Sequence, residues 1–202
     1  MQLDISHIVS LYSKSNIVAF TLRSLMEQEG GLHRELILVD DNSTDNTVQV
    51  VRECTKNFPL VTIVEHNNNK GPSVRLNEGA RLSRAKYVHF LDHDDILPAN
   101  ATKIMYDILE ETGADFIYGK WEITHNTPAE LLGRRAKEKA DYFVSNEPLK
   151  TVLNGRFKRM CLLARRSFFA ESGGFDEEVF IQDESLPLRM AAKAKTMVVL
   201  DA

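Results

Sequence analysis

Short apolar runs alternate with amphipathic segments through the first 120 residues of the chain. The apolar runs predict strands at residues 5–12, 35–39, 60–65, 86–91 and 114–123. Helical spacing predicts helices at residues 46–57, 73–85 and 99–111, and an earlier helix with the apolar face Val18, Leu22, Leu25 and Met26. Ser15 or Asn16 is expected to cap that first helix. Such alternation is typical of an α/β sheet.

The pattern lapses between residues 125 and 154, where Pro, Gly, charged residues and isolated apolar residues mix without a clear period. We expect a mobile loop there, with at most one short helix. Beyond it, a strand is predicted at residues 160–164, a helix at 183–194 and a strand at 196–200. Because the chain stops on a strand, we expect it to be part of a longer protein.

Length and composition favour a single soluble domain. With 202 residues, 43% of them hydrophobic, the chain can bury one substantial core. Apolar runs such as residues 197–200 are too short to span a bilayer, and the N-terminus lacks the pattern of a signal peptide. Two cysteines without CxxC spacing argue against a disulfide framework or a zinc site and favour the cytoplasm. The net charge of −4 gives no reason to expect nucleic acid as a partner.

Three carboxylates follow one predicted strand within four positions, because the strand at residues 86–91 leads into Asp92, Asp94 and Asp95. Crowded carboxylates repel one another unless a positive charge neutralises them. A hard ion such as Mg²⁺ or Mn²⁺, which also bridges to phosphate oxygens, is one candidate for that charge. The alternative is a solvated acidic turn that caps the helix after Pro98.

A second acidic pair, Asp40 and Asp41, follows the strand at residues 35–39. Ligands of open α/β sheets bind at the carboxyl ends of the strands, so two acidic clusters at such ends favour a binding site. Asp40 or Asp45 has the alternative role of capping the next helix. The loop at residues 69–73 begins another helix and offers its backbone N–H groups, or the ammonium of Lys70, to a phosphate.

Several segments, taken in order, resemble one protein family. They read LVDDNSTD (38–45), NKG (69–71), NEG (77–79), YVHFLDHDD (87–95), GGFDE (173–177) and QDE (182–184) before LR (188–189). They are similar to family 2 glycosyltransferases and cover almost the whole chain. The resemblance implies the GT-A (Rossmann-like) fold, with a mixed, mostly parallel sheet flanked by helices.

The same resemblance implies an inverting enzyme that moves a sugar from a nucleotide diphosphate donor to a saccharide or other hydroxyl acceptor, as in cell-envelope polysaccharide synthesis. The expected cofactor is Mn²⁺ or Mg²⁺. Residues 1–120 would form the half that binds the nucleotide sugar and residues 121–202 the half that binds the acceptor. No membrane span is expected, and peripheral association with a membrane is left open.

The resemblance assigns the nucleobase to three residues. Asp41 matches the aspartate that hydrogen-bonds the base, and Ser10 and Tyr12 match the segment that lines it. A carboxylate accepts the N–H of a uracil ring and an aromatic ring covers its face, so a UDP-sugar is the expected donor. Tyr12 has the alternative of being a core residue.

The acidic motif would hold the ribose and the metal. We expect Asp95 to be the direct metal ligand and Asp94 to bind the ribose, with Asp92 and Lys70 also in the donor site. The metal would bridge the two phosphates and stabilise the leaving diphosphate.

Asp183 matches the second residue of the family's Glu-Asp pair and is the expected general base, which takes the proton of the acceptor hydroxyl. Gln182 stands where the family has the first carboxylate. Glu184 and Trp121 are expected acceptor contacts. The alternatives are that Asp183 and Glu184 only stabilise the first turn of a helix, and that Trp121 only packs.

Two further departures from the family pattern bear on binding. Ser10 and Ser13 stand where the family often carries Pro and Asn around Tyr12. The Arg that often precedes the family's Asn is replaced by Leu76, and Arg75 stands one place earlier. Residues 150–166 contain six basic residues and no acidic one. They predict either a solvated basic face or the attraction of an anionic diphosphate or acceptor.

Three other classes of protein are alternatives to a glycosyltransferase. A non-catalytic nucleotide-sugar binding module stays open because Gln182 lacks the carboxylate. A sugar-nucleotide pyrophosphorylase would carry a Gly-rich loop after the first strand, and residues 12–15 contain no Gly. A receiver domain would have its acidic pair after the first strand and not the second.

Overall fold

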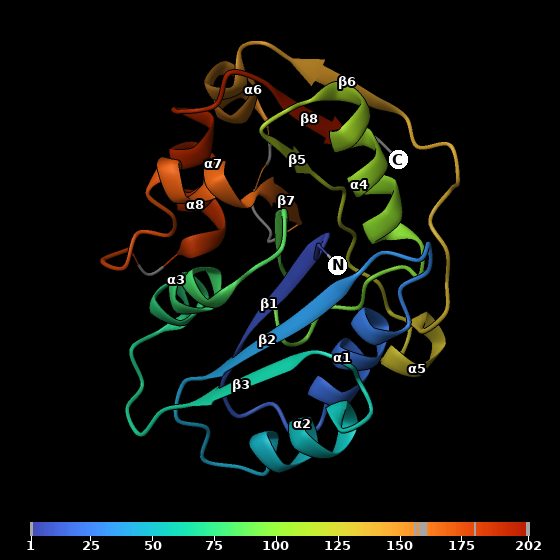
Figure 1. Cartoon of the computed structure of the whole chain (residues 1–202), viewed down its shortest axis with the longest axis vertical. Helices are drawn as coiled ribbons and strands as arrows, with labels where there is room; N and C mark the ends of the chain where they lie inside the picture. Colours follow the sequence, from blue (N-terminus) through green and yellow to red (C-terminus); the bar gives the residue numbers. More distant parts are fainter. Residues whose placement is uncertain (1, 156, 158–160, 180, 201–202) are drawn as a thin grey trace.

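The computed structural model describes residues 2–155, 157, 161–179 and 181–200. Its strands are β1 (Ile5–Leu11), β2 (Arg34–Asp40), β3 (Val61–Glu65), β4 (Tyr87–Phe90), β5 (Phe116–Tyr118), β6 (Tyr142–Ser145), β7 (Leu162–Arg165) and β8 (Met197–Leu200). They form one sheet in the order β3-β2-β1-β4-β7-β5-β8-β6 (Figure 1). β1, β2, β3 and β4 pair in parallel, whereas β7 runs antiparallel to β4 and β5, and β6 antiparallel to β8. The sheet is therefore mixed and mostly parallel, as predicted.

Helices cover both faces of this sheet. They are α1 (Val18–Met26), α2 (Thr47–Thr55), α3 (Pro72–Leu82), α4 (Ala101–Thr112), α5 (Pro128–Leu131), α6 (Pro148–Asn154), α7 (Arg166–Ser172) and α8 (Gln182–Ala191). Figure 1 shows α3, α7 and α8 on one side of the strands and α1, α2 and α4 on the other. This arrangement explains why the central strands β1 and β4 are buried along their whole length.

The strand β1 illustrates how both faces are filled. All seven of its residues are buried. Ile8 packs in one apolar cluster with Leu76 of α3, whereas its neighbour Val9 packs in another cluster with Leu22 of α1. Successive side chains of a strand point to opposite faces. β1 is therefore buried on both faces even at its polar residues Ser6, His7 and Ser10, whereas β2 carries a continuous apolar run at residues 36–39.

The predicted elements of the first 112 residues are all present, but the predicted cap of α1 is wrong. The residue at the N-cap position is Ile17, and it makes no capping hydrogen bond through its side chain. Ser15 instead donates its backbone N–H to Asp45 at 3.0 Å. The backbone oxygen of Lys14 accepts the N–H groups of Ile17 (3.1 Å) and Val18 (3.0 Å), so a local backbone turn takes the place of a side-chain cap.

The sequence predictions are weakest beyond residue 112. The strand predicted at residues 114–123 is β5 alone, α7 was not expected, and the region at 125–154 contains α5, α6 and the unexpected strand β6. Phe143 and Val144 of β6 are 49% and 43% exposed, so β6 lacks the alternation of a half-buried strand. Its pairing with β8 defines it instead. The strand predicted from Met160 begins at Leu162, and Met160 itself lies outside the described residues.

Candidate functional site

The predicted donor-site residues lie at the carboxyl edge of the sheet, where β1, β2 and β4 end. The strand order reverses there, because β2 lies on one side of β1 and β4 on the other. Loops diverge at such a reversal and leave room for a ligand. Ser10 is near the end of β1 and 7% exposed, and Tyr12 follows that strand and is 44% exposed. Tyr12 is therefore not a core residue and can offer its ring to a ligand.

Hydrogen bonds connect the loop after β1 to the loop after β2. Backbone N–H groups donate to side-chain oxygens in three pairs: Ser13 to Ser43 (2.9 Å), Lys14 to Thr47 (2.8 Å) and Ser15 to Asp45 (3.0 Å). The hydrogen bond from the Thr47 side chain is the largest cause, and together with the bonds from Ser15 it outweighs the effect of burial and holds the pKa of Asp45 far below its usual range. Asp45 is thus ionised and ties the start of α2 to the first loop.

Asp41 is enclosed by hydrogen-bond donors. It is 3% exposed, and its carboxylate accepts the N–H groups of Lys70 (2.8 Å) and Gly71 (2.7 Å). The Nε of Arg75 donates to the same carboxylate at 2.7 Å. Because these two N–H groups are occupied by Asp41, the Lys70 ammonium is the group of this loop that can meet a phosphate. Asp40 has a different role, since it closes its own turn by accepting the N–H of Ser43 at 2.9 Å.

Arg75 is a site residue to which the motifs assigned no role. Its side chain is 3% exposed, and it also donates to the backbone oxygen of Asn68 at 2.7 Å. An arginine is rarely buried without a partner, and here the partner is Asp41. The ion pair therefore fixes the loop at residues 68–71 over the end of β2. The available signal was an Arg four positions before Gly79, on the same face of the helix, and both residues are buried.

The acidic motif forms a turn directly after β4. The N–H of Asp95 donates to the backbone oxygen of Asp92 at 3.2 Å, and His93 Nδ1 donates to the backbone oxygen of Ser10 at 2.9 Å. His93 therefore turns inward, whereas Asp94 and Asp95 are exposed. Burial raises the pKa of Asp94, but the hydrogen bond from Lys14 Nζ at 2.9 Å and the charges of His93 and Lys14 outweigh it and lower the pKa overall. The motif is thus docked on β1 through His93, with carboxylates facing solvent.

These carboxylates suit a metal that arrives with a diphosphate better than a metal held by protein alone. Among the residues that the structure describes, no group of three or more His, Cys, Asp or Glu side chains could hold a metal ion. Mg²⁺ commonly uses one or two carboxylates and completes its shell with substrate phosphates and water. The exposed carboxylates of Asp94 and Asp95 can supply these one or two protein ligands.

Helix α8 carries Asp183 and Glu184 in its first turn. Leu186 and Met190 of this helix pack in the apolar cluster that contains Phe90, the last residue of β4 before the acidic turn. The helix is thus anchored on the α3 side of the sheet. Two carboxylates in a first turn also stabilise the helix, so the structural alternative for both residues remains.

The expected acceptor surface is only partly described. Trp121 lies three residues beyond β5 and is 36% exposed. In the basic stretch, Lys150 pairs with Glu147, whereas the Nε atoms of Arg165 and Arg166 donate to backbone oxygens. Arg156, Lys158 and Arg159 lie outside the described residues.

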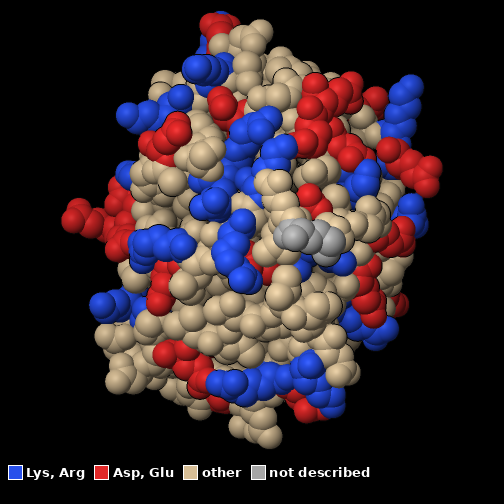
Figure 2. Space-filling view, in the orientation of Figure 1, with Lys and Arg blue, Asp and Glu red and all other residues tan. Residues whose placement is uncertain are grey.

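Figure 2 shows basic and acidic side chains interspersed on one face, with groups of Lys and Arg in its upper centre and near its lower edge. Within the described part of the chain, no helix is long and apolar enough to cross a membrane.

The sheet, its flanking helices and the loops at its carboxyl edge are those of the GT-A fold. In agreement with this, the chain matches the description "Glycosyl transferase family 2" over residues 6–171. The chain therefore belongs to glycosyl transferase family 2, and the fold and family predictions are confirmed.

Two curated relatives are named for transfer to poly(ribitol phosphate). The chain is 31% identical over 144 residues to the poly(ribitol-phosphate) beta-N-acetylglucosaminyltransferase TarP of Staphylococcus aureus, which covers 68% of this chain and 43% of TarP. It is 28% identical over 120 residues to the poly(ribitol-phosphate) beta-glucosyltransferase of Bacillus spizizenii, which covers 58% of this chain and 19% of that protein. The matches thus span less than half of either relative.

Two solved structures share the fold. S. aureus TarS 1–349 in complex with UDP-GlcNAc has a TM-score of 0.79 at 22% identity, covering 99% of this chain and 57% of that chain. The mannosyltransferase PcManGT from Pyrobaculum calidifontis, in complex with GDP-Man and Mn²⁺, has a TM-score of 0.75 at 18% identity, covering 99% of this chain and 56% of that one.

Proposed function

We propose that this chain is the catalytic domain of an enzyme that transfers a sugar from a UDP-sugar to a hydroxyl group of a saccharide or polyol-phosphate acceptor, with inversion at the anomeric carbon. The observation that carries the proposal is the buried Asp41 carboxylate beside an exposed acidic turn, at the edge where the strand order reverses. Family membership and the UDP-GlcNAc complex of the structural neighbour TarS support it. A cytoplasmic location stays a prediction.

The nucleoside would lie between the ends of β1 and β2. Of the described residues, Gly71 alone donates to Asp41 Oδ2. A carboxylate oxygen has two acceptor positions, so Oδ2 can also accept the N–H of uracil. The exposed ring of Tyr12 would cover the base, Ser10 would line it, and Asp94 with Asp92 would bind the ribose.

The diphosphate would lie over the acidic turn, with Asp95 as the metal ligand and the Lys70 ammonium as a second positive charge. When bound there, Mn²⁺ or Mg²⁺ would stabilise the negative charge of the leaving nucleoside diphosphate. Lys14, which pairs with Asp94, adds a third positive charge at the same edge.

In the transfer step, the acceptor hydroxyl oxygen attacks the anomeric carbon from the face opposite the diphosphate. A new C–O bond forms, the bond from the anomeric carbon to the phosphate oxygen breaks, and the hydroxyl proton passes to Asp183. Residues 121–202 would supply the acceptor contacts, including Trp121 and Glu184. The names of TarP and the Bacillus relative make poly(ribitol phosphate), a polyol-phosphate polymer, the first acceptor to test.

The experiment incubates the protein with UDP-GlcNAc or UDP-glucose, poly(ribitol phosphate) and Mn²⁺, and follows UDP release together with product mass. We expect transfer that depends on acceptor and is lost in EDTA. UDP-sugar binding by calorimetry without transfer to any acceptor of a broad panel would instead favour the second candidate, a nucleotide-sugar binding module. Gln182 favours that module, because it replaces a carboxylate next to the proposed base.

A further inference from the structure

Asn77 joins the two proposed halves of the domain. It lies on α3, is 9% exposed, and contacts a segment about 100 positions away in the sequence. Its Nδ2 donates to the backbone oxygen of Phe175 at 3.0 Å, and the N–H of Phe175 donates to Asn77 Oδ1 at 2.9 Å. Nδ2 also donates to Glu177 Oε1 at 2.9 Å. The Asn77 side chain thus provides a hydrogen-bond partner for both the backbone N–H and the backbone oxygen of the buried Phe175.

The segment that Asn77 holds is the GGFDE loop, residues 173–177. Gly174 has φ = 64°, and a Cβ at this position would lie 2.6 Å from Asn77 Oδ1. The loop therefore approaches Asn77 as closely as only glycine allows. Phe175 is 2% exposed and stacks edge-to-face on Phe90, with ring centroids 5.0 Å apart. The loop is thus locked both to α3 and to the end of β4.

Helix α8 holds the same loop from the other side. The Arg189 side chain donates to the backbone oxygen of Gly174 at 3.0 Å and to Asp176 Oδ2 at 2.9 Å. Arg189 lies in the last turn of α8, and Asp183 lies in its first turn. The GGFDE loop therefore connects two helices. One is α3, whose first residues surround Asp41, and the other is α8, which carries the proposed base Asp183.

We propose that Asn77 is a positioning residue that sets the location of α8, and hence of Asp183, relative to the donor site. The inference rests on the proposed function. Hydrogen bonds from Asn77 fix the loop backbone, and the loop fixes α8 through Arg189. Because a displacement of about 1 Å in a reacting group can cost a factor of about 100 in rate, this connection affects turnover more than donor binding.

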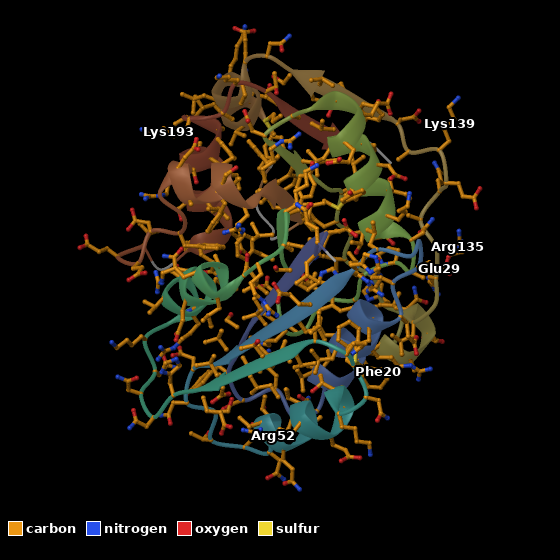
Figure 3. The ribbon with its side chains drawn as sticks, viewed as in Figure 1. Phe20, Glu29, Arg52, Arg135, Lys139 and Lys193 are labelled. Atoms are coloured by element: carbon orange, nitrogen blue, oxygen red, sulfur yellow. The ribbon has the colours of Figure 1, made fainter. Side chains whose placement is uncertain are left out.

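The structure offers a matched control in Asn100. It is 6% exposed, its Nδ2 donates to the backbone oxygen of Ala136 at 3.0 Å, and the N–H of Ala136 donates to its Oδ1 at 2.8 Å. Asn100 therefore holds the loop around Ala136 by the same pair of hydrogen bonds with which Asn77 holds Phe175. Figure 3 places that region, marked by the ion pair of Glu29 and Arg135, on the side of the molecule opposite to α3.

The first arm of the test measures hydrogen–deuterium exchange in Asn77→Ala and Asn100→Ala. We expect Asn77→Ala to speed exchange of amides 173–179 and 182–186, and Asn100→Ala to speed exchange around residue 136 while leaving α8 unchanged. Unchanged exchange in 182–186 of Asn77→Ala would overturn the proposal. Should Asn77→Ala fail to fold, Asn77→Asp takes its place, because it keeps the acceptor for the Phe175 N–H and loses both donated bonds.

The second arm measures kcat with UDP-GlcNAc and poly(ribitol phosphate), and the Kd for UDP. We expect kcat of Asn77→Ala to fall roughly 10- to 100-fold while the Kd stays nearly constant, Asn77→Asp to fall less, and Asn100→Ala to keep its kcat. An equal loss in UDP affinity and kcat would overturn the positioning role. If the unmutated protein transfers no sugar, the proposed function fails, whereas the exchange arm still decides whether Asn77 positions α8.

Discussion

The proposed donor half, residues 1–120, and the proposed acceptor half, residues 121–202, differ in what their described surfaces present. Exposed large apolar side chains are few in the donor half: Tyr12, Leu60 and Leu82. In the acceptor half they are Trp121, Ile123, Phe143, Val144, Leu149, Leu153, Val179, Ile181 and Leu188. The donor half closes its loops with buried polar contacts, whereas the acceptor half leaves apolar surface open. Exposed apolar side chains mark a binding face where they form a contiguous patch.

The difference indicates where each half obtains its specificity. Asp41, Arg75 and the N–H groups of residues 70–71 satisfy one another inside the chain, so the donor loops are fixed before any ligand arrives. A fully satisfied buried polar network is rigid, and removing one member leaves the others unpaired. In the described part of the acceptor half, a comparable network is the one in which Asn77 and Arg189 hold the GGFDE loop. The predictions below test this contrast.

The largest effect is expected from Arg75→Met, which breaks the buried ion pair of the donor half. Removing one partner leaves the Asp41 charge buried without its partner, which typically costs about 3–5 kcal/mol in the free energy of unfolding. Urea unfolding measures this loss. The control is Arg52→Met, whose side chain is 58% exposed and pairs with Glu65, where a loss below about 1 kcal/mol is expected. Equal losses in the two variants would contradict the rigid-loop interpretation.

Next in size is Asp183→Asn, which probes the acceptor half. The amide keeps the size of the side chain and removes the base, so transfer should fall on the order of 10²-fold or more while UDP affinity is retained. Transfer rate and calorimetric Kd are measured on the same preparation. Glu171→Gln, an exposed residue of α7, controls for loss of charge in this half. Near-normal transfer by Asp183→Asn would exclude it as the base.

A pH effect should arise in the donor half, because His7 and His89 are buried on adjacent strands with their Nδ1 atoms 2.9 Å apart. Burial lowers the pKa of His89 to about 4, and burial, the charge of His89 and that of Arg34 lower the pKa of His7. The unfolded chain therefore binds more protons than the folded one below about pH 6.5, and stability falls as the pH decreases towards 4.

Urea unfolding between pH 7 and pH 5 checks this expectation. His89 alone should account for a loss of about 2 kcal/mol. His89→Asn, which keeps a polar atom near the position of Nδ1 and does not titrate, should flatten the dependence. The same change at the exposed His33 should leave it as it is. A pH slope that His89→Asn does not alter would assign the effect to other groups.

The smallest effect is expected from Lys14→Met, which removes an exposed cation from the acidic turn. Lys14 and Asp94 are 40% and 41% exposed, so the pair should contribute at most about 1 kcal/mol to stability. That contribution should shrink as salt is added, because exposed charges are screened. Thermal unfolding at low and high salt tests this point. A larger loss that salt does not affect would show that Lys14 belongs to the rigid donor network.

The contrast between the halves also explains how far sequence prediction reached. In the donor half, strands such as β2 are buried on both faces, so a continuous apolar run, here residues 36–39, specifies them. In the acceptor half, β6 pairs through its backbone at the sheet edge and exposes Phe143 and Val144, so no side-chain period reveals it. The cap of α1 was mispredicted because the backbone oxygen of Lys14 accepts the N–H groups at the start of the helix, and a backbone contact leaves no mark on residue type.

The sequence by itself determined the α/β alternation, the order of the acidic motifs and their place at strand ends, because periodicity and short motifs are local properties of the chain. Only the tertiary structure decided that β7 runs antiparallel between β4 and β5, that Arg75 pairs with Asp41, and that Asn77 holds Phe175. Each of these contacts joins residues at least 34 positions apart. A buried polar group takes whichever partner the fold brings within hydrogen-bond distance, and no local pattern encodes that choice.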